Sequence, residues 1–187
     1  MKKSLIVAAL FATAFASTGA MAQAHAYVSA DVGASHASLD CTGIASCDNN
    51  DVSFKVTAGY KLGYGFAAEF GYIDFGTAKA SDSGVDVKVK SKAWTLGAAY
   101  ELPIAADFSG VARLGVASMK TTGSANIVGV GSGSVSDTKT EAYYGLGANY
   151  AVAKNIKIKA GIDWSHADLQ GSTAVVRSIS AGVQYEF

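Results

Sequence analysis

The sequence predicts an all-β fold, an antiparallel up-and-down transmembrane β-barrel of about eight strands. Three observations favour this fold. Apolar and polar residues alternate with period two along most of the chain, the connections between these segments are short and long in turn, and charged residues stand in the middle of the polar faces. A soluble β-sandwich would account for the alternation, but it would bury those charges in a dry core at a high cost.

The first residues have the pattern of a secretory signal peptide. A pair of lysines follows the initial methionine, an apolar stretch covers 5–16, and Ala20-Met21-Ala22 matches a cleavage site built of small residues. The apolar stretch is too short to span a bilayer as a helix. We therefore expect a cleaved signal peptide over 1–22, with the cleavage point uncertain between 22 and 26, and one barrel domain over 23–187.

The first four predicted strands lie in the first hundred or so residues. The segment 27–38 sets valine and alanine against serine and aspartate, and 52–61 sets valine, phenylalanine and tyrosine against serine, threonine and lysine. In 66–75, phenylalanine and alanine alternate with glutamate and glycine. The fourth strand ends over 94–100, where tryptophan, leucine and tyrosine alternate with threonine and glycine. A strand with one apolar and one polar face produces this period.

The last four predicted strands follow the same rule. Segment 108–116 opposes phenylalanine, leucine and valine to serine, arginine and glycine, and 144–150 opposes tyrosine and leucine to glycine and asparagine. Segment 156–165 opposes isoleucine and tryptophan to lysine and aspartate. The chain finishes over 178–187 with isoleucine, valine and aromatic residues against serine, glutamine and glutamate. Each of these segments therefore presents one apolar and one polar face.

The connections between the predicted strands alternate in length. Short ones cover 62–65, 102–107 and 151–155, whereas 39–51 and 120–139 are examples of long ones. In outer-membrane barrels, short turns lie on the periplasmic side and long loops on the external side. A sandwich gives no reason for this sorting.

Aromatic residues gather at two levels of the predicted strands. Amphipathic rings prefer the boundary between lipid headgroups and hydrocarbon, so two levels indicate two aromatic girdles. Next to the short turns or the C-terminus are Tyr60, Tyr64, Phe66, Tyr100, Phe108, Tyr150, Tyr185 and Phe187. Towards the long loops are Phe54, Tyr72, Phe75, Trp94, Tyr144 and Trp164.

The polar faces carry full charges in mid-strand. These are Asp31, Lys55, Glu69, Arg113, Lys159 and Asp163. An eight-stranded barrel has an interior just wide enough for side chains to fill it. We therefore expect a polar network inside the lumen in which Glu69 and Arg113 take part, with the other four as neighbours.

The composition bears on which partners, metals and cofactors we expect the protein to bind. The 15 basic residues equal the 15 acidic ones in number, so nothing suggests a nucleic-acid partner. Cys41 and Cys47 are close together in a chain expected to meet an oxidising compartment, which favours a disulfide over a metal pair. We expect neither a metal site nor a cofactor.

The C-terminal residues have a pattern that is typical of a known family. Ile179, Ala181, Val183, Tyr185 and Phe187 alternate with polar or small residues up to the terminal phenylalanine. This pattern resembles the C-terminus of the small eight-stranded outer-membrane β-barrels, such as OmpA transmembrane-domain-like and OmpX-like proteins. The resemblance implies the outer membrane of a Gram-negative bacterium, Sec export, contact with lipid and lipopolysaccharide, and an assembly signal for the barrel-assembly machinery. No peptidoglycan-binding domain follows, so no cell-wall tether is implied.

Two classes of function remain open at this point. One is a structural or surface-interaction role in which the external loops meet an extracellular ligand or a host surface. The other is a narrow, porin-like channel for small or hydrophobic solutes. The segment 121–138 either extends a hairpin or contacts a ligand or host surface. A lipid-modifying enzyme is a remote alternative, since His36 and Ser38 share a face but no carboxylate is set beside them, and we expect no enzyme.

Overall fold

The structure, a computed structural model, describes residues 25–38, 46–82, 85–127, 131–169 and 172–187. Cys41 lies outside these residues, as does the expected signal peptide. The described part of the chain contains only β-strands as regular elements. They are β1 (Ala26–Ala37), β2 (Ser46–Asp48), β3 (Asn50–Gly63), β4 (Phe66–Asp82), β5 (Val85–Pro103), β6 (Phe108–Ile127), β7 (Gly131–Ala153), β8 (Ile156–Leu169) and β9 (Ser172–Glu186).

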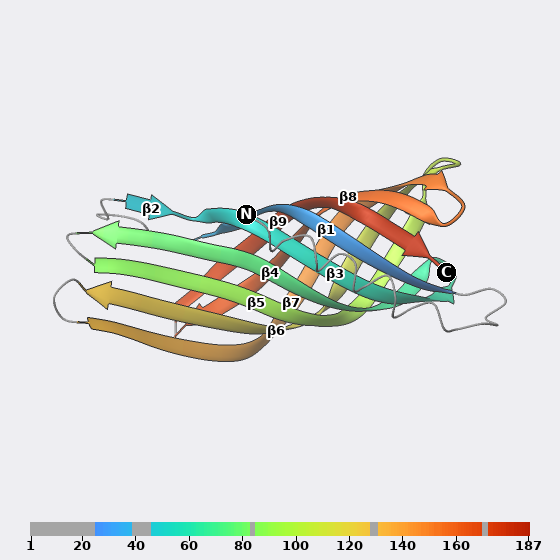
Figure 1. The fold of residues 1–187 in the computed structure, drawn as a ribbon. Coiled ribbons are helices and arrows are strands. Elements are labelled where there is room, and N and C mark those ends of the chain that lie inside the picture. The colour runs from blue at the N-terminus through green and yellow to red at the C-terminus, as the bar shows by residue number, and fades with distance from the viewer. Residues whose placement is uncertain (1–24, 39–45, 83–84, 128–130, 170–171) are drawn as a thin grey trace.

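The sheet closes on itself as a barrel. Every pairing is antiparallel, β1 lies between β3 and β9, and β4 pairs with β5 to complete the ring (Figure 1). The short β2 pairs only with the outer part of β4, so eight of the nine strands form the wall. This is the predicted fold class, and closure leaves the membrane part of the wall with no unpaired edge.

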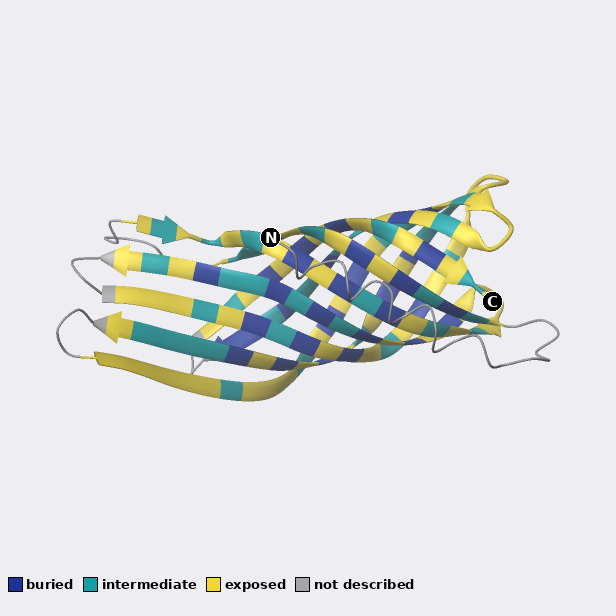
Figure 2. Cartoon of the chain, in the orientation of Figure 1, coloured by how far each residue is buried: buried dark blue, intermediate teal, exposed yellow. Residues whose placement is uncertain are grey.

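Exposure alternates along the wall, as Figure 2 shows in its sequence of dark blue and yellow segments. In β3, Val52 and Phe54 are 65% and 47% exposed, whereas the alternate residues Ser53 and Lys55 are buried. Successive side chains of a strand point to opposite faces, so the apolar set looks outward and the polar set looks into the barrel. The exposed apolar side chains therefore form the lipid-facing surface.

The two ends of the barrel differ. At the inner end, next to the C-terminus in Figure 1, short turns join β3 to β4, β5 to β6 and β7 to β8. Gly63, Tyr64 and Gly65 all have positive φ, which makes the first of these turns tight. At the outer end, the β4–β5 and β6–β7 hairpins project beyond the outer ends of β8 and β9, with β2 beside β4.

The glycine- and serine-rich segment 121–138 belongs to one of these hairpins. The register of β6 with β7 continues without a shift from Phe108↔Tyr150 to Ile127↔Gly131. Over its described residues, 121–127 and 131–138, the segment therefore extends the hairpin. Outside a membrane, paired strands satisfy the backbone groups that a long loop would leave to water.

The placement of Phe75 in the outer aromatic girdle was wrong. Phe75 is only 5% exposed and lies inside the barrel, because it follows the inward-facing Ile73 by two residues. Phe75 itself lies in a bulge between Asp74 and Thr77. Asp51 holds this bulge, since its Oδ2 accepts a hydrogen bond of 2.7 Å from the Thr77 amide. Other girdle rings do lie outside and pair across strands, as Tyr72 does with Trp94 and Tyr144 with Trp164.

Candidate functional site

The six charged residues expected in the lumen form three buried ion pairs. Arg113 Nε lies 3.0 Å from Glu69 Oε2, and their side chains are 4% and 8% exposed. Lys55 donates to Asp163, and Lys159 Nζ lies 3.5 Å from Asp31 Oδ2. Three cations meet three anions, so the network is neutral in sum. Removing one partner would leave a charge without compensation in a space that water scarcely reaches.

Two tyrosines that the sequence analysis did not include belong to the same network. The Tyr27 hydroxyl donates to Glu69 Oε1 at 2.6 Å, and the Tyr143 hydroxyl donates to Asp163 Oδ1 at 2.6 Å. Both rings are buried. The alternation contained the signal, because both tyrosines occupy positions of the polar face. The expected network was limited to residues with full charges, so it left both tyrosines out.

A second charged cluster, which the sequence analysis also missed, lies at the inner mouth. Lys157 Nζ lies 2.7 Å from Glu101 Oε1 and 3.0 Å from Glu186 Oε1, and Glu186 also pairs with Lys61 at 2.5 Å. These side chains come from β8, β5, β9 and β3, so the cluster joins strands that are not all neighbours. It ties the mouth together at the turn end.

Strand β6 shows how the interior is layered. Going outward along its inner face, Val111 is followed by Arg113 of the ionic network, and then by Ala117 and Met119. The last two belong to an apolar cluster that fills the barrel on the outer side of the network. The cluster comprises Ile73, Phe75, Ala93, Ala117, Met119, Tyr143, Ala167 and Val176. The interior is thus polar at its centre and apolar nearer the outer end.

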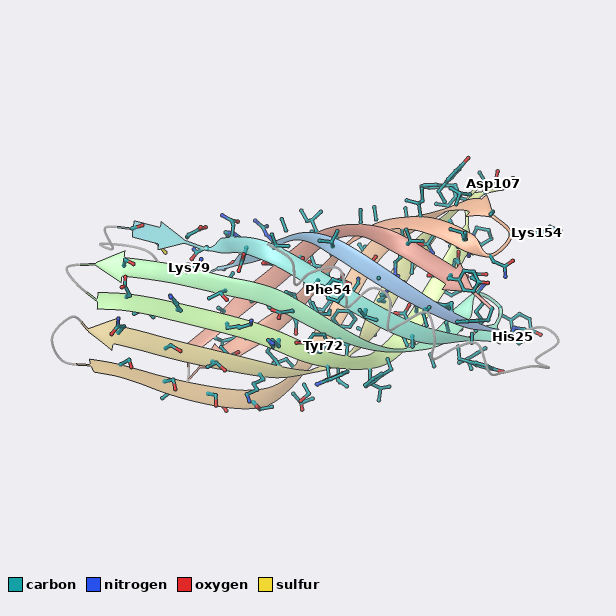
Figure 3. All side chains as sticks on the ribbon, in the orientation of Figure 1. His25, Phe54, Tyr72, Lys79, Asp107 and Lys154 are labelled. Carbon is teal, nitrogen blue, oxygen red and sulfur yellow. The ribbon has the colours of Figure 1, made fainter. Side chains whose placement is uncertain are left out.

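The outward face of the projecting strands carries a group of lysines that we call the outer lysine face. It comprises Lys79, Lys88, Lys90, Lys92 and Lys120. The register sets Lys79 directly opposite Lys88, and Lys92 directly opposite Lys120. Figure 3 labels Lys79 near the outer end of β4.

Only part of this positive charge is balanced by nearby aspartates. Asp74 Oδ2 lies 3.4 Å from Lys92 Nζ and 3.7 Å from Lys90 Nζ, and Asp86 follows on the same side of β5. On β2, Asp48 lies directly opposite Lys79, so three aspartates stand against five lysines. A hydrogen bond with Tyr72, and after it the charge of Asp74, raises the pKa of Lys92. This lysine therefore keeps its charge at neutral pH.

The other residues singled out from sequence lie apart from these groups. The outward side chains of β9 and of the residue that follows it are exposed: Ile179, Val183, Tyr185 and Phe187 are between 37% and 61% exposed, and Ala181 is exposed among them. Cys47 lies on β2. The ring of His36 contacts Asn50 at the outer rim, where Nδ1 lies 3.0 Å from Asn50 Oδ1.

A closed antiparallel barrel with an apolar outside, aromatic pairs on its surface and charges paired within is the architecture of outer-membrane barrel proteins. In the described residues, no helix is long and apolar enough to cross a membrane. The chain belongs to the family of the OmpA-like transmembrane domain, whose model matches residues 21–187. No curated protein sequence matches it.

Solved structures share this fold. Neisserial surface protein A is 19% identical with a TM-score of 0.63, and the match covers 87% of this chain and 97% of that one. Ail, the attachment invasion locus protein of Yersinia pestis, is 19% identical with a TM-score of 0.57, covering 87% and 99%. Ail has also been solved with the heparin analogue sucrose octasulfate. The N-terminal β-barrel domain of Pseudomonas aeruginosa OprF is 18% identical with a TM-score of 0.53, covering 88% and 98%.

Proposed function

We propose that the protein is an exported outer-membrane barrel with a surface-interaction role, and that it binds anionic polysaccharide through the outer lysine face. The observation that carries this proposal is the row of lysines on the outward side of β4, β5 and β6. Like charges directly opposite each other on a sheet are unfavourable. An anionic ligand lying across the strands would relieve the repulsion of both lysine pairs.

The height of the lysines supports a ligand that follows the wall outward. Lys92 lies two residues beyond the girdle residue Trp94, so it is about 7 Å farther out along the tilted strand, and Lys88 is about 20 Å farther along it. The nearer lysines are then at the level of lipid headgroups and the farther ones project into the surface layer. Phosphorylated sugars of lipopolysaccharide and sulfated external glycans share the required chemistry. The complex of Ail with a sulfated sugar supports this class of ligand.

Binding of heparin and of lipopolysaccharide to the full barrel tests this proposal. We expect protein reconstituted in phosphatidylcholine vesicles to bind at least one of them, with an affinity that falls as salt rises. Replacing three lysines together (Lys79→Gln, Lys88→Gln, Lys90→Gln) should weaken binding about tenfold or more, because each lost contact removes part of the attraction. Lys154→Gln at the inner end is the control and should change nothing (Figure 3). Unchanged binding of both probes by the triple variant would refute the proposal.

We also propose the steps that bring the protein to the surface. The segment 1–22 directs export, and the pattern from Ile179 to Phe187 is read by the barrel-assembly machinery. Cys41 and Cys47 close a small disulfide ring ahead of β3, which stiffens the outer end. N-terminal sequencing of protein from an outer-membrane fraction tests the cleavage, and thiol alkylation before and after reduction tests the disulfide.

A further inference from the structure

A cavity of about 460 Å³ lies inside the outer end of the barrel, beyond the apolar cluster. Its volume falls within the range of small-molecule sites. Residues from β1, β3, β4, β5, β6, β8 and β9 border it. Much of its lining is apolar and includes Ala37, Phe75, Ala78, Val89, Ala167 and Val176.

One polar group on this lining has no partner. Thr121 is 1% exposed, and among the described residues its Oγ1 is the buried side-chain polar atom that makes no hydrogen bond. Buried polar groups are nearly always hydrogen-bonded, so an orphan group calls for an explanation. Thr121 lies two residues outward from Met119 on the inner face of β6 and borders the cavity, although its Oγ1 itself is covered in this structure.

Neighbouring polar groups of the lining are already engaged with the protein. The Ser35 hydroxyl contacts the carbonyl oxygens of Phe75 and Asp51 at 2.5 and 3.1 Å. The Asp51 carboxylate accepts hydrogen bonds from the amides of Val52 and Thr77. No lysine or arginine is among the described residues that border the cavity. An anionic ligand would find no cation there, which favours a neutral one.

We propose that this cavity binds a small neutral amphiphile, whose apolar body packs against Phe75, Val89 and Val176. On binding, the Thr121 side chain turns so that its Oγ1 forms a hydrogen bond with a hydroxyl or carbonyl group of the ligand. The site is a blind pocket, because Met119 and Ile73 are 1% exposed and fill the barrel beneath it. This role is separate from polysaccharide binding: β5 turns Lys88 and Lys90 outward and Val89 inward.

Backbone NMR of the full barrel in phosphatidylcholine nanodiscs, titrated with 1-octanol, tests the inference. We expect saturable shifts at the amides of Thr121, Ser91 and Val176. Octanol that merely dissolves in the lipid will instead move outward residues such as Leu96 in proportion to its concentration. Saturation at the inner residues therefore separates binding from partitioning.

Two variants test the two halves of the site. Thr121→Val keeps the shape of the side chain and removes the hydroxyl, so octanol affinity should fall up to about tenfold. Ala78→Trp should fill the cavity and abolish the saturable shifts. Thr138→Val on the exposed part of β7 is the matched control and should bind as the original chain does.

The inference fails if wild-type protein shows no saturable shift at the cavity residues. It also fails if Thr121→Val binds octanol with unchanged affinity, because the orphan hydroxyl would then have no part in recognition. Heat-modifiable migration in detergent gels checks that each variant is folded. Since Thr121→Val is close in volume to the native residue, its result stands even if the tryptophan variant does not assemble.

Discussion

At the residue scale, Glu69 has two partners inside the barrel. Its carboxylate accepts hydrogen bonds from Arg113 Nε and from the Tyr27 hydroxyl, and all three side chains are buried. The arrangement satisfies each group at the centre of the membrane part. Loss of any one of these three side chains would therefore leave another buried polar group without a hydrogen-bond partner.

The variant Glu69→Gln should destabilise the barrel by about 3–5 kcal/mol, because it leaves the Arg113 charge buried without its counter-ion. Changing both residues to apolar ones, Glu69→Leu with Arg113→Met, should recover much of this loss. Denaturant unfolding of the protein in lipid vesicles measures both effects.

Asp107→Asn, in an exposed turn at the inner end, is the control and should stay within about 0.5 kcal/mol of the original. A Glu69→Gln protein as stable as this control would mean that the ion pair contributes nothing to the fold.

Asp168, at the outer end of β8, offers a prediction on pH. The Thr173 hydroxyl donates a hydrogen bond to its carboxylate and is the main cause that lowers the pKa of Asp168; Lys139, 3.7 Å away, acts in the same direction. A lowered pKa in the folded state means that the contact stabilises above the ordinary aspartate pKa and is lost as pH falls through the lowered value. Thr173→Val should therefore move the titration midpoint of Asp168 upward, as read from its carboxyl ¹³C shift. Thr138→Val should not move it.

At the scale of elements, β6 and β7 are longer than a strand needs to be to span a membrane. A spanning strand takes about 9–11 residues, whereas β6 has 20 and β7 has 23. The excess projects at the outer end and carries Lys120 on one face and Thr121 on the other. The same period-two geometry thus serves an external surface and an internal cavity on one strand.

The last strand makes a prediction of its own, because β9 pairs with both β8 and β1 and so joins the two ends of the chain. Phe187→Ala should slow assembly several-fold in cells, since we propose that the outward residues of β9 are the assembly signal. The fraction of pulse-labelled protein with heat-modifiable migration measures the rate. Phe66→Ala removes another outward ring beside a short turn and is the control. Equal slowing by both variants would show that aromatic surface, and not the terminal pattern, sets the rate.

At the scale of the whole molecule, the contents of the barrel bear on the choice between surface interaction and conduction. The paired charges at the centre and the apolar cluster beyond them occupy successive levels of the interior. An ion would have to displace paired charges and then cross apolar surface.

Purified protein in planar bilayers should therefore give no regular conductance steps across lipid compositions, whereas an open porin in the same bilayers should conduct. Reproducible steps from the folded barrel would favour the narrow channel instead. Protein recovered as a soluble periplasmic species would contradict the membrane fold itself.

Much of this architecture can be predicted from the sequence, since side-chain direction follows from strand geometry alone. The alternation assigns Lys55 and Arg113 to the inner face without knowledge of any neighbour. The same rule, applied without the expectation that aromatic residues belong to girdles, would have placed Phe75 inside. That error came from weighing residue type above position.

Period-two alternation by itself determined the fold class, the lipid-facing surface and the residues that enter the interior. Only the tertiary structure decided the partners: that Lys55 meets Asp163, that Thr121 is left without one, and that Lys79 stands opposite Lys88. Such pairings depend on strand register and on which strands lie across the barrel from each other. These are properties of the closed sheet, and no local pattern along one strand carries them.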